Sequence, residues 1–392
     1  MATLILKVTE KCNSNCYYCD VVRKEKTGQT MSLQTLGTVF RRVDEYLRKN
    51  PGERMEILWH GGEPLLPGAD YYRRAIALFN RHCAETRNSI HHSIQTNLTC
   101  FHEEFVDIFR SLGVTAAGTS YDPEPCIRGP GENIDSEAYN RKFIRSLAVL
   151  ERNGFGWGMI YVVTKKSLAK PLEVFHFLSN LSLSGGFNIN PVLIYDEERR
   201  GIAITPEEYV DFLGAIFPVW WNHRERYPDV QPFKSLVRTI IEGQLSLGCV
   251  ESGDCTYHHV NVTPDGETSQ CGRSADWGLL QYGNIEDKSL AEILGDPQRG
   301  QLEERVRKLK DKDCRGCRFW EICHGGCPLD AYSKHKSFLF KSEWCESRRG
   351  FIERYFEPLT KVRYQPGRFS ISGPSICHGD GGEIGRSDGK TD

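Results

Sequence analysis

The sequence has no apolar run long enough to cross a membrane, and its apolar start, residues 2–8, runs directly into a polar, cysteine-containing loop. A signal peptide would need a basic start, a longer apolar stretch and a cleavage site with small residues. There is also no excess of charge of one sign: the formal net charge is −2, and no basic stripe stands out. Membrane insertion and nucleic-acid binding are therefore not expected, and a cytoplasmic location is favoured.

What the chain has in quantity is cysteine. With 392 residues, of which 39% are hydrophobic, it is long enough to bury a core without covalent staples. In a reducing compartment, its 15 cysteines argue against a disulfide framework. They point instead to ligation of metal ions or of a metal cofactor.

The first half of the chain alternates between apolar, β-rich runs and helical patterns. The expected strands are residues 4–8, 55–59, 90–95, 115–120, 159–163 and 188–194. The expected helices are residues 32–49, 71–85, 101–113, 137–154 and 171–181. Six such units imply a parallel sheet with right-handed crossovers, and they are fewer than the eight of a closed barrel. The prediction is an α/β fold, an open, partial (β/α)6 TIM-like barrel with its ligands at the carboxyl ends of the strands.

The second half of the chain has a different character. Residues 205–245 read as a helical bridge, and residues 246–361 form a cysteine- and glycine-rich domain with short strands. Residues 362–392, which include Cys377, read as a flexible, polar tail. The barrel is accordingly expected to cover residues 1–204.

Three cysteines, Cys12, Cys16 and Cys19, follow the first expected strand in the pattern CxxxCxxC. Thiolates hold iron–sulfur clusters well, and a four-iron cluster has four corners. Three cysteines leave one iron open, and an open position is what a catalytic metal site needs. A zinc site with a distant fourth ligand is the alternative.

This pattern resembles the signature of the radical S-adenosylmethionine (SAM) superfamily. The resemblance implies that the open iron chelates the methionine part of SAM, and that a 5′-deoxyadenosyl radical then abstracts a hydrogen atom from the substrate. It also implies an external one-electron donor of the flavodoxin or ferredoxin type. The chemistry belongs to the cofactors, and the protein positions them.

Other strand ends resemble the SAM pocket of the same superfamily. The second strand runs into a GGEP motif in which Glu63 suits the SAM amino group. The glycines beside it, Gly61 and Gly62, allow backbone to approach a ligand closely. The remaining residues implied by the resemblance are Tyr18 near adenine, Gln95, Asn97, Ser120 and Arg128 at the barrel mouth, and Leu193 at the end of the sixth strand.

Eight further cysteines lie in the C-terminal half, and "CRGCRFWEICHGGCPLDA" closely resembles the SPASM extension of radical SAM peptide maturases. By this resemblance one auxiliary [4Fe-4S] cluster takes Cys249, Cys255, Cys271 and Cys327. The other takes Cys314, Cys317, Cys323 and Cys345. With the SAM-binding cluster, this makes three [4Fe-4S] clusters. Zinc-ribbon-like sites built from the same pairs are the alternative.

Enzymes with this extension mostly modify peptides or proteins. The sulfatase-maturing group has an Asp, acting as a base, directly after the cysteine equivalent to Cys271, whereas this chain has Gly272. The first-choice interpretation is therefore a maturase that installs a crosslink in a ribosomally made peptide. Formylglycine formation in a sulfatase is the second, and a non-catalytic iron–sulfur or zinc protein is the third. Only eleven residues precede Cys12, so we expect leader recognition by other surfaces or by a separate protein.

Four cysteines remain outside these groups, and for most of them we expect an incidental, buried role. They are Cys83, Cys100, Cys126 and Cys377. Cys126 differs because it lies between Ser120 and Arg128, close to the expected SAM pocket. The hypothesis is that its thiol returns a hydrogen atom to a substrate radical.

Overall fold

The protein is seen here in a computed structural model, which describes residues 1–19, 28–195, 198–253, 255–367 and 369. Strands and helices alternate through its first half, as the sequence predicts. They are β1 (Ala2–Thr9), α1 (Leu33–Lys49), β2 (Met55–Gly61), α2 (Ala69–His82), β3 (Ile90–Ile94), α3 (Glu104–Leu112), β4 (Ala116–Ser120), α4 (Ser136–Arg152), β5 (Gly156–Val163), α5 (Pro171–Ser179) and β6 (Phe187–Pro191). All expected strands and helices of this half are present, with ends shifted by a few residues.

The local sequence explains where these helices begin and end. Ser32 caps α1 by accepting a hydrogen bond from the backbone N–H of Thr35, and Asp135 caps α4 in the same way. The helix α3 stops at Gly113, whose φ of +71° places it in the left-handed region that glycine adopts without strain. The caps fix the length of each crossover between parallel strands.

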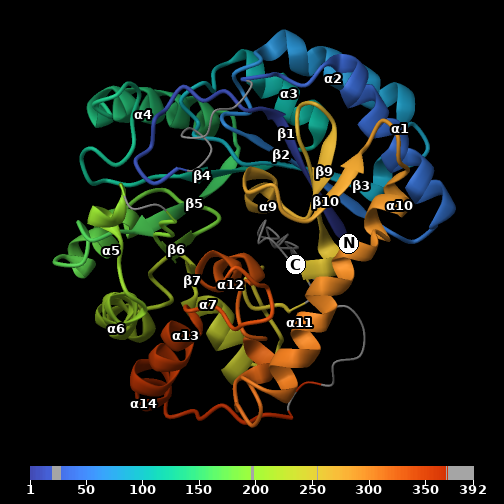
Figure 1. Cartoon of the computed structure of the whole chain (residues 1–392). Helices are drawn as coiled ribbons and strands as arrows, with labels where there is room; N and C mark the ends of the chain where they lie inside the picture. Colours follow the sequence, from blue (N-terminus) through green and yellow to red (C-terminus); the bar gives the residue numbers. More distant parts are fainter. Residues whose placement is uncertain (20–27, 196–197, 254, 368, 370–392) are drawn as a thin grey trace, which may run out of the picture.

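The strands form an open arc. One sheet has the order β10-β9-β8-β1-β2-β3, the other has the order β4-β5-β6-β7, and a single parallel bridge between Gln95 and Gly118 links them. Within the described residues no strand pairing joins β7 to β10, so the barrel is partial, as predicted. Helices α1 to α5 lie along the outside of the arc (Figure 1).

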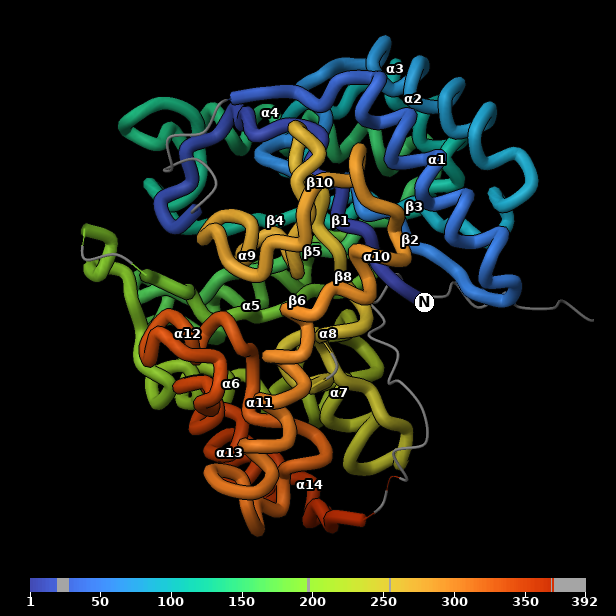
Figure 2. Tube along the Cα trace, turned by 45° about the vertical axis from the view of Figure 1, so that its right-hand side comes forward, coloured from blue at the N-terminus to red at the C-terminus, as the bar shows by residue number. Residues whose placement is uncertain are grey.

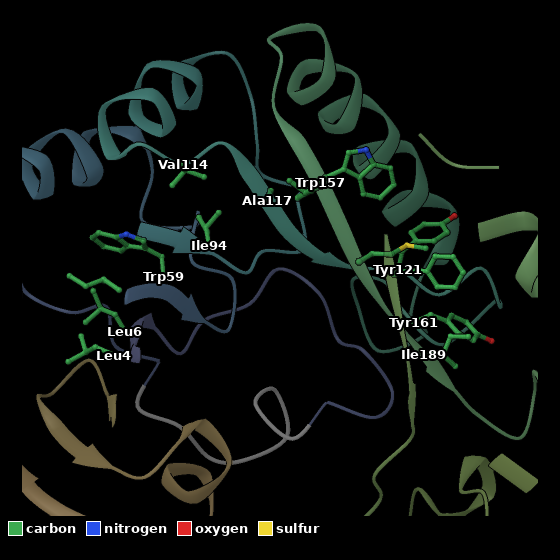
Figure 3. Packing of buried hydrophobic residues seen from close by; sticks show 14 of the residues in the cluster. Leu4, Leu6, Trp59, Ile94, Val114, Ala117, Tyr121, Trp157, Tyr161 and Ile189 are labelled. Atoms are coloured by element: carbon green, nitrogen blue, oxygen red, sulfur yellow. The ribbon is translucent and has the colours of Figure 1, made fainter. Parts of the chain in front are cut away.

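Side chains on the outer face of the arc build the core beneath the helices. Leu4 and Leu6 of β1, Trp59 of β2 and Trp157 of β5 are almost completely buried there (Figure 3). Because successive residues of a strand point to opposite faces, Lys7 points into the barrel. The outer face therefore stabilises the fold, and the inner face is available for chemistry.

The C-terminal half begins with a long helix and continues with short elements. These are α6 (Pro206–Asn222), β7 (Val230–Gln231), α7 (Phe233–Leu236), α8 (Cys255–His258), β8 (His259–Val262), β9 (Glu267–Ser269), α9 (Gly272–Asp276), β10 (Gln281–Asn284), α10 (Leu290–Leu294), α11 (Gly300–Asp311), α12 (Pro328–His335), α13 (Cys345–Phe351) and α14 (Glu357–Thr360). The helices α11 to α14 gather at the end of the molecule away from α1 to α4 (Figure 2). No helix in the described residues is long and apolar enough to cross a membrane.

Two features of this half are absent from the sequence-based expectation. The segment expected as a purely helical bridge contains β7, which extends the second sheet beside β6. In addition, β8 pairs in parallel with β1, with Leu4 opposite Val260, so the two halves of the chain share one sheet. The cysteine-rich region is thus fixed directly to the strand that precedes the first cysteine loop. Most of the expected tail, Cys377 included, lies outside the described residues.

Candidate active site

The loop with Cys12, Cys16 and Cys19 follows the carboxyl end of β1. Cys16 is buried, and the other two thiols are half-buried. The loop is held by backbone bonds to a distant segment: the N–H of Tyr17 donates to the carbonyl oxygen of Ile127 at 2.8 Å. Burial raises the pKa of the Cys12 thiol to about 12, and the nearby Glu63 carboxylate adds to the effect. A thiolate at this position therefore requires a cation beside it.

The glycines of the GGEP motif make close contacts within the chain, and the close approach to a ligand that is expected of them stays a prediction. A Cβ on Gly61 would lie 2.3 Å from the carbonyl oxygen of Thr9, and one on Gly62 would lie 2.3 Å from that of Lys11. The close approach is thus to the chain's own backbone. The N–H of Gly62 donates to Thr9 at 2.8 Å, and the N–H of Glu63 donates to Lys11 at 2.8 Å. These contacts fix the motif against the segment that leads into the cysteine loop.

Glu63 is completely buried. Its carboxylate accepts hydrogen bonds from the hydroxyl of Thr96 at 2.6 Å and from the N–H groups of Asn97 at 2.7 Å and Leu65 at 3.0 Å. Burial raises its pKa to about 6, against the lowering effect of these three donors. Because a carboxylate offers about four acceptor positions, one remains for a ligand's ammonium group.

Arg128 is closed into a buried network. Its Nε donates to Asp122 at 3.0 Å, and the hydroxyl of Tyr18 donates to the same carboxylate oxygen at 2.6 Å. The guanidinium of Arg128 also donates to the Tyr18 hydroxyl. Asp122 is therefore the charge partner of Arg128. Together they tie the loop after β4 to the first cysteine loop.

The other expected pocket residues fall into two places. At the strand ends, Nε2 of Gln95 donates to the hydroxyl of Ser120 at 3.4 Å. Asn97 instead reaches the cysteine loop, where its Nδ2 donates to Oδ1 of Asn13 at 2.8 Å and lies 3.9 Å from Sγ of Cys12. The structure thus divides these side chains between the strand ends and the loop.

Two more expected residues lie further out. Leu193 is half-buried, two residues beyond the end of β6. Cys126 is exposed, with a φ of +56°, and its N–H donates to the hydroxyl of Ser136 at 3.0 Å. Its suggested role in returning a hydrogen atom stays a prediction.

The barrel contains an ion pair that the sequence did not predict. Nζ of Lys7 donates to Asp276 at 2.9 Å and to the carbonyl oxygen of Gly272 at 3.1 Å. The side chains of Lys7 and Asp276 are only 2% and 8% exposed. His60 is the register partner of Lys7 on β2, and burial, helped by the Lys7 charge, lowers its pKa to about 4. One signal was visible: a lysine in an otherwise apolar strand.

The first auxiliary set of cysteines comes together around α9. The thiols of Cys249 and Cys255 share a hydrogen bond, and Cys249 interacts electrostatically with Cys271 and with Cys327. Arg273, two residues after Cys271, donates from Nη2 to Sγ of Cys327 at 2.9 Å. Residues separated by nearly 80 positions in the sequence thus face one another.

The second auxiliary set is also assembled. The thiols of Cys323 and Cys345 share a hydrogen bond, which lowers the pKa of Cys323 to about 6. Cys314 interacts electrostatically with Cys317, Cys323 and Cys345. These contacts bring the thiols near one another without placing them around a single ion: in the described residues, no group of three or more Cys, His, Asp or Glu side chains is arranged to hold one metal ion.

Iron–sulfur clusters fit these two sets in donor type and in surroundings. All donors are thiols, and the cysteines in the described residues are free of disulfides. Buried arginine N–H groups without a partner lie beside them, namely Nε of Arg305, and Nε and Nη2 of Arg348. Arg348 interacts with Cys323, and Arg305 interacts with members of both sets. Thiolate-ligated clusters are anionic, so they satisfy such cations.

The chain matches known families over both halves. Residues 6–178 match the radical SAM superfamily, and residues 253–318 match the SPASM iron–sulfur cluster-binding domain. A radical SAM domain implies SAM and a [4Fe-4S] cluster, and a SPASM domain binds iron–sulfur clusters.

Two relatives are similar over most of the chain. A cysteine-type anaerobic sulfatase-maturating enzyme of Clostridium novyi is 24% identical and covers 92% of this chain and 97% of its own length. A serine-type anaerobic sulfatase-maturating enzyme of Bacteroides thetaiotaomicron is 22% identical and covers 84% of this chain and 83% of its own length.

Two solved structures share the fold. Native anSMEcpe with bound AdoMet and Kp18Cys peptide has a TM-score of 0.76 at 22% identity, covering 92% of this chain and 98% of that one. SuiB of Streptococcus suis bound to precursor peptide SuiA has a TM-score of 0.60 at 17% identity, covering 88% of this chain and 75% of that one. At these identities the likeness describes the architecture alone. The two family matches lead to one conclusion: the chain has a radical SAM domain, followed by a SPASM domain.

Proposed function

We propose that this chain is a radical SAM maturase that modifies a side chain of a peptide or protein, with three [4Fe-4S] clusters and SAM as cofactors. The observation that carries the proposal is the three-cysteine loop at the carboxyl end of β1, with no fourth cysteine in its motif and with buried Glu63 behind it. When bound there, SAM and the first cluster would supply the radical chemistry that removes a hydrogen atom from the substrate.

The chain's own residues then hold and orient the reactants. Glu63 has one free acceptor position for the SAM ammonium group, and its three hydrogen bonds keep the carboxylate in place. Arg128 and Tyr18, fixed by Asp122, position the cysteine loop and the adenine end of the pocket. Gln95 and Ser120 supply polar groups at the strand ends. An open barrel side admits an extended peptide, and an external donor delivers the electrons.

The preferred modification is a crosslink in a ribosomally made peptide. The residue after Cys271 is Gly272, so this position offers no carboxylate. A Cβ on Gly272 would lie 3.4 Å from Cε of Lys7. The nearest acid, Asp276, is already paired with Lys7. SuiB, which shares the fold, binds a precursor peptide. Formylglycine formation remains the second candidate, since relatives of that activity match nearly the whole chain.

The proposed division of the chain is a barrel at 1–204, a bridge at 205–245, a SPASM domain at 246–361 and a tail at 362–392. Two features support it: the matched ranges lie inside the first and third parts, and α6 begins at Pro206. The shared sheet between β1 and β8 means that the barrel and the SPASM domain are expected to unfold together.

The first test asks whether the protein cleaves SAM at all. Anaerobically reconstituted protein is expected to hold about twelve irons per chain and to form 5′-deoxyadenosine from SAM on reduction. Adding the substrate peptide should raise that rate and remove two hydrogen atoms from the peptide, as mass spectrometry would show. Colourless protein that holds zinc and leaves SAM intact would establish the non-catalytic alternative instead.

The second test separates the two candidate modifications. In Gly272→Asp the new carboxylate has room beside Lys7 and lies in the first turn of α9, where an acid is favourable. With the Kp18Cys peptide, wild-type protein should form 5′-deoxyadenosine but little formylglycine. The variant should form at least about tenfold more formylglycine, because a positioned base is then present.

Gly272→Asn is the matched control, because it has the same size without the acid and should resemble wild type. Iron content is measured in all three proteins, since Cys271 is adjacent. Wild-type protein that forms formylglycine as fast as Gly272→Asp would refute the crosslink preference and favour the sulfatase-maturing candidate.

A further inference from the structure

Arg305 of α11 lies between the two auxiliary sets of cysteines. Only 3% of its surface is exposed. It interacts electrostatically with Cys255 and Cys327 of the first set and with Cys314 and Cys323 of the second. One cationic side chain therefore faces ligands of both proposed clusters.

The hydrogen bonds of Arg305 go to the turn that connects the two sets. Nη2 donates to the carbonyl oxygen of Gly325 at 2.9 Å, and Nη1 donates to that of His324 at 3.3 Å. This turn runs from Cys323, in the second set, to Cys327, in the first. A Cβ on Gly325 would lie 2.5 Å from the side chain of Leu309, one turn further along α11, so the helix packs directly on the turn. Arg305 thus fixes the backbone between one ligand of each set.

The positive charge of Arg305 lacks an acidic partner in the described part of the chain. Its strongest electrostatic interactions are with cysteines, and its Nε has no hydrogen-bond partner. Two other arginines near the cysteines differ: Arg273 pairs with Asp330, and Arg348 pairs with Glu251. A buried, unpaired guanidinium is costly and stays protonated, so its environment has to supply negative charge. Two thiolate-ligated clusters, one on each side, would do so.

We propose that Arg305 is the shared counter-ion of the two auxiliary clusters and raises the reduction potential of both. This rests on the proposed function, in which both sets hold clusters. Reduction adds one negative charge to a cluster, and a nearby cation stabilises the reduced form more than the oxidised form. Charge and hydrogen bonds at the cluster are levers that set such potentials. The two clusters are thereby linked through one side chain.

The experiment is a redox titration, followed by electron paramagnetic resonance, of the full chain with Cys12, Cys16 and Cys19 replaced by Ala. Only the auxiliary clusters then contribute to the signal. At a fixed solution potential, Arg305→Gln should lower the ratio of reduced to oxidised cluster by about tenfold or more for both clusters. A tenfold change in this ratio corresponds to a 59 mV shift of the reduction potential for one electron.

Two matched variants make the result specific. Arg307→Gln removes the same charge from an exposed position of the same helix and should shift neither cluster. Arg273→Gln removes a donor to Cys327 and should shift only the first cluster. A shift of one cluster only in Arg305→Gln, or of neither, overturns the proposal.

A loss of folding can be told apart from a wrong inference. Should Arg305→Gln fail to retain iron, Arg305→Lys, which keeps the charge, decides the matter. In Arg305→Lys, a ratio of reduced to oxidised cluster within about threefold of wild type supports the proposal. A tenfold fall in that ratio overturns it. If the parent protein with Arg305 intact holds no auxiliary iron, the proposed cluster sites themselves are wrong.

Discussion

Replacing Cys12 with Ala is expected to abolish SAM cleavage and to leave the auxiliary clusters in place. The first loop offers three cysteines, and two thiolates cannot hold a four-iron cluster with a single open corner. The formation of 5′-deoxyadenosine should fall by at least about a thousandfold, since the chemistry depends wholly on the cofactor. Iron should fall by about one third, from about twelve to about eight per chain.

Cys100→Ala is the matched control for this prediction. Cys100 is a half-buried thiol beside the same loop, and its Sγ accepts a hydrogen bond from Nδ2 of Asn13 at 3.1 Å, but it lies outside the CxxxCxxC pattern. It should retain full iron content and measurable SAM cleavage. If Cys12→Ala still forms 5′-deoxyadenosine, or if Cys100→Ala is the inactive variant, the ligand assignment is wrong.

The alternation of strands and helices in the barrel could be predicted because it is encoded locally. In α1 the buried residues Leu36, Val39, Phe40 and Val43 recur three and four positions apart, and Ser32 marks the start. The apolar strands between such helices leave a parallel sheet as the consistent arrangement. The cysteine spacing is equally local, so the candidate site could also be located in advance.

Pairings across the chain could not be predicted in this way. Val230–Gln231 is too short to give a strand signal, and it forms β7 only because β6 offers it an unpaired edge. The pairing of β8 with β1 joins residues that are more than 250 positions apart. The spacing of cysteines says nothing about which buried cations lie between them, so Arg305 and its position emerge only in three dimensions.

The GGEP motif shows a different limit. The missing Cβ atoms of Gly61 and Gly62 predict close approach of backbone to a ligand, which stays a prediction, and the sequence does not say what else occupies the space that a Cβ would take. The structure assigns that space to the backbone of Thr9 and Lys11. A glycine requirement derived from a motif therefore predicts close approach, and only the fold identifies the approaching group.

The ion pair between Lys7 and Asp276 leads to the second large effect. It joins β1 of the barrel to α9 of the cysteine-rich half, and both side chains are almost fully buried. Breaking such a pair from one side leaves a buried charge without compensation. Lys7→Met is expected to destabilise the protein by about 3–5 kcal/mol, measured as a shift of the urea-unfolding midpoint.

The double variant Lys7→Met/Asp276→Leu tests the cause. Replacing both charges with apolar groups of similar volume removes the desolvation cost along with the attraction, so the double variant should recover most of the loss. Arg41→Met, which removes one side of the exposed pair between Arg41 and Glu45, should change stability by only about 0.5 kcal/mol.

A Lys7→Met variant as stable as wild type would mean that Asp276 has enough other partners, and the pair would then not hold the two halves together. A double variant that is less stable than either single one would mean that the site needs its polar groups for packing or hydration. With the expected recovery, the ion pair and an apolar pair at this place contribute nearly equally to stability, so stability alone does not explain why the pair is charged. The charged pair beside Gly272 would then serve to make the interior of the barrel polar. We expect the substrate side chain to react in this interior.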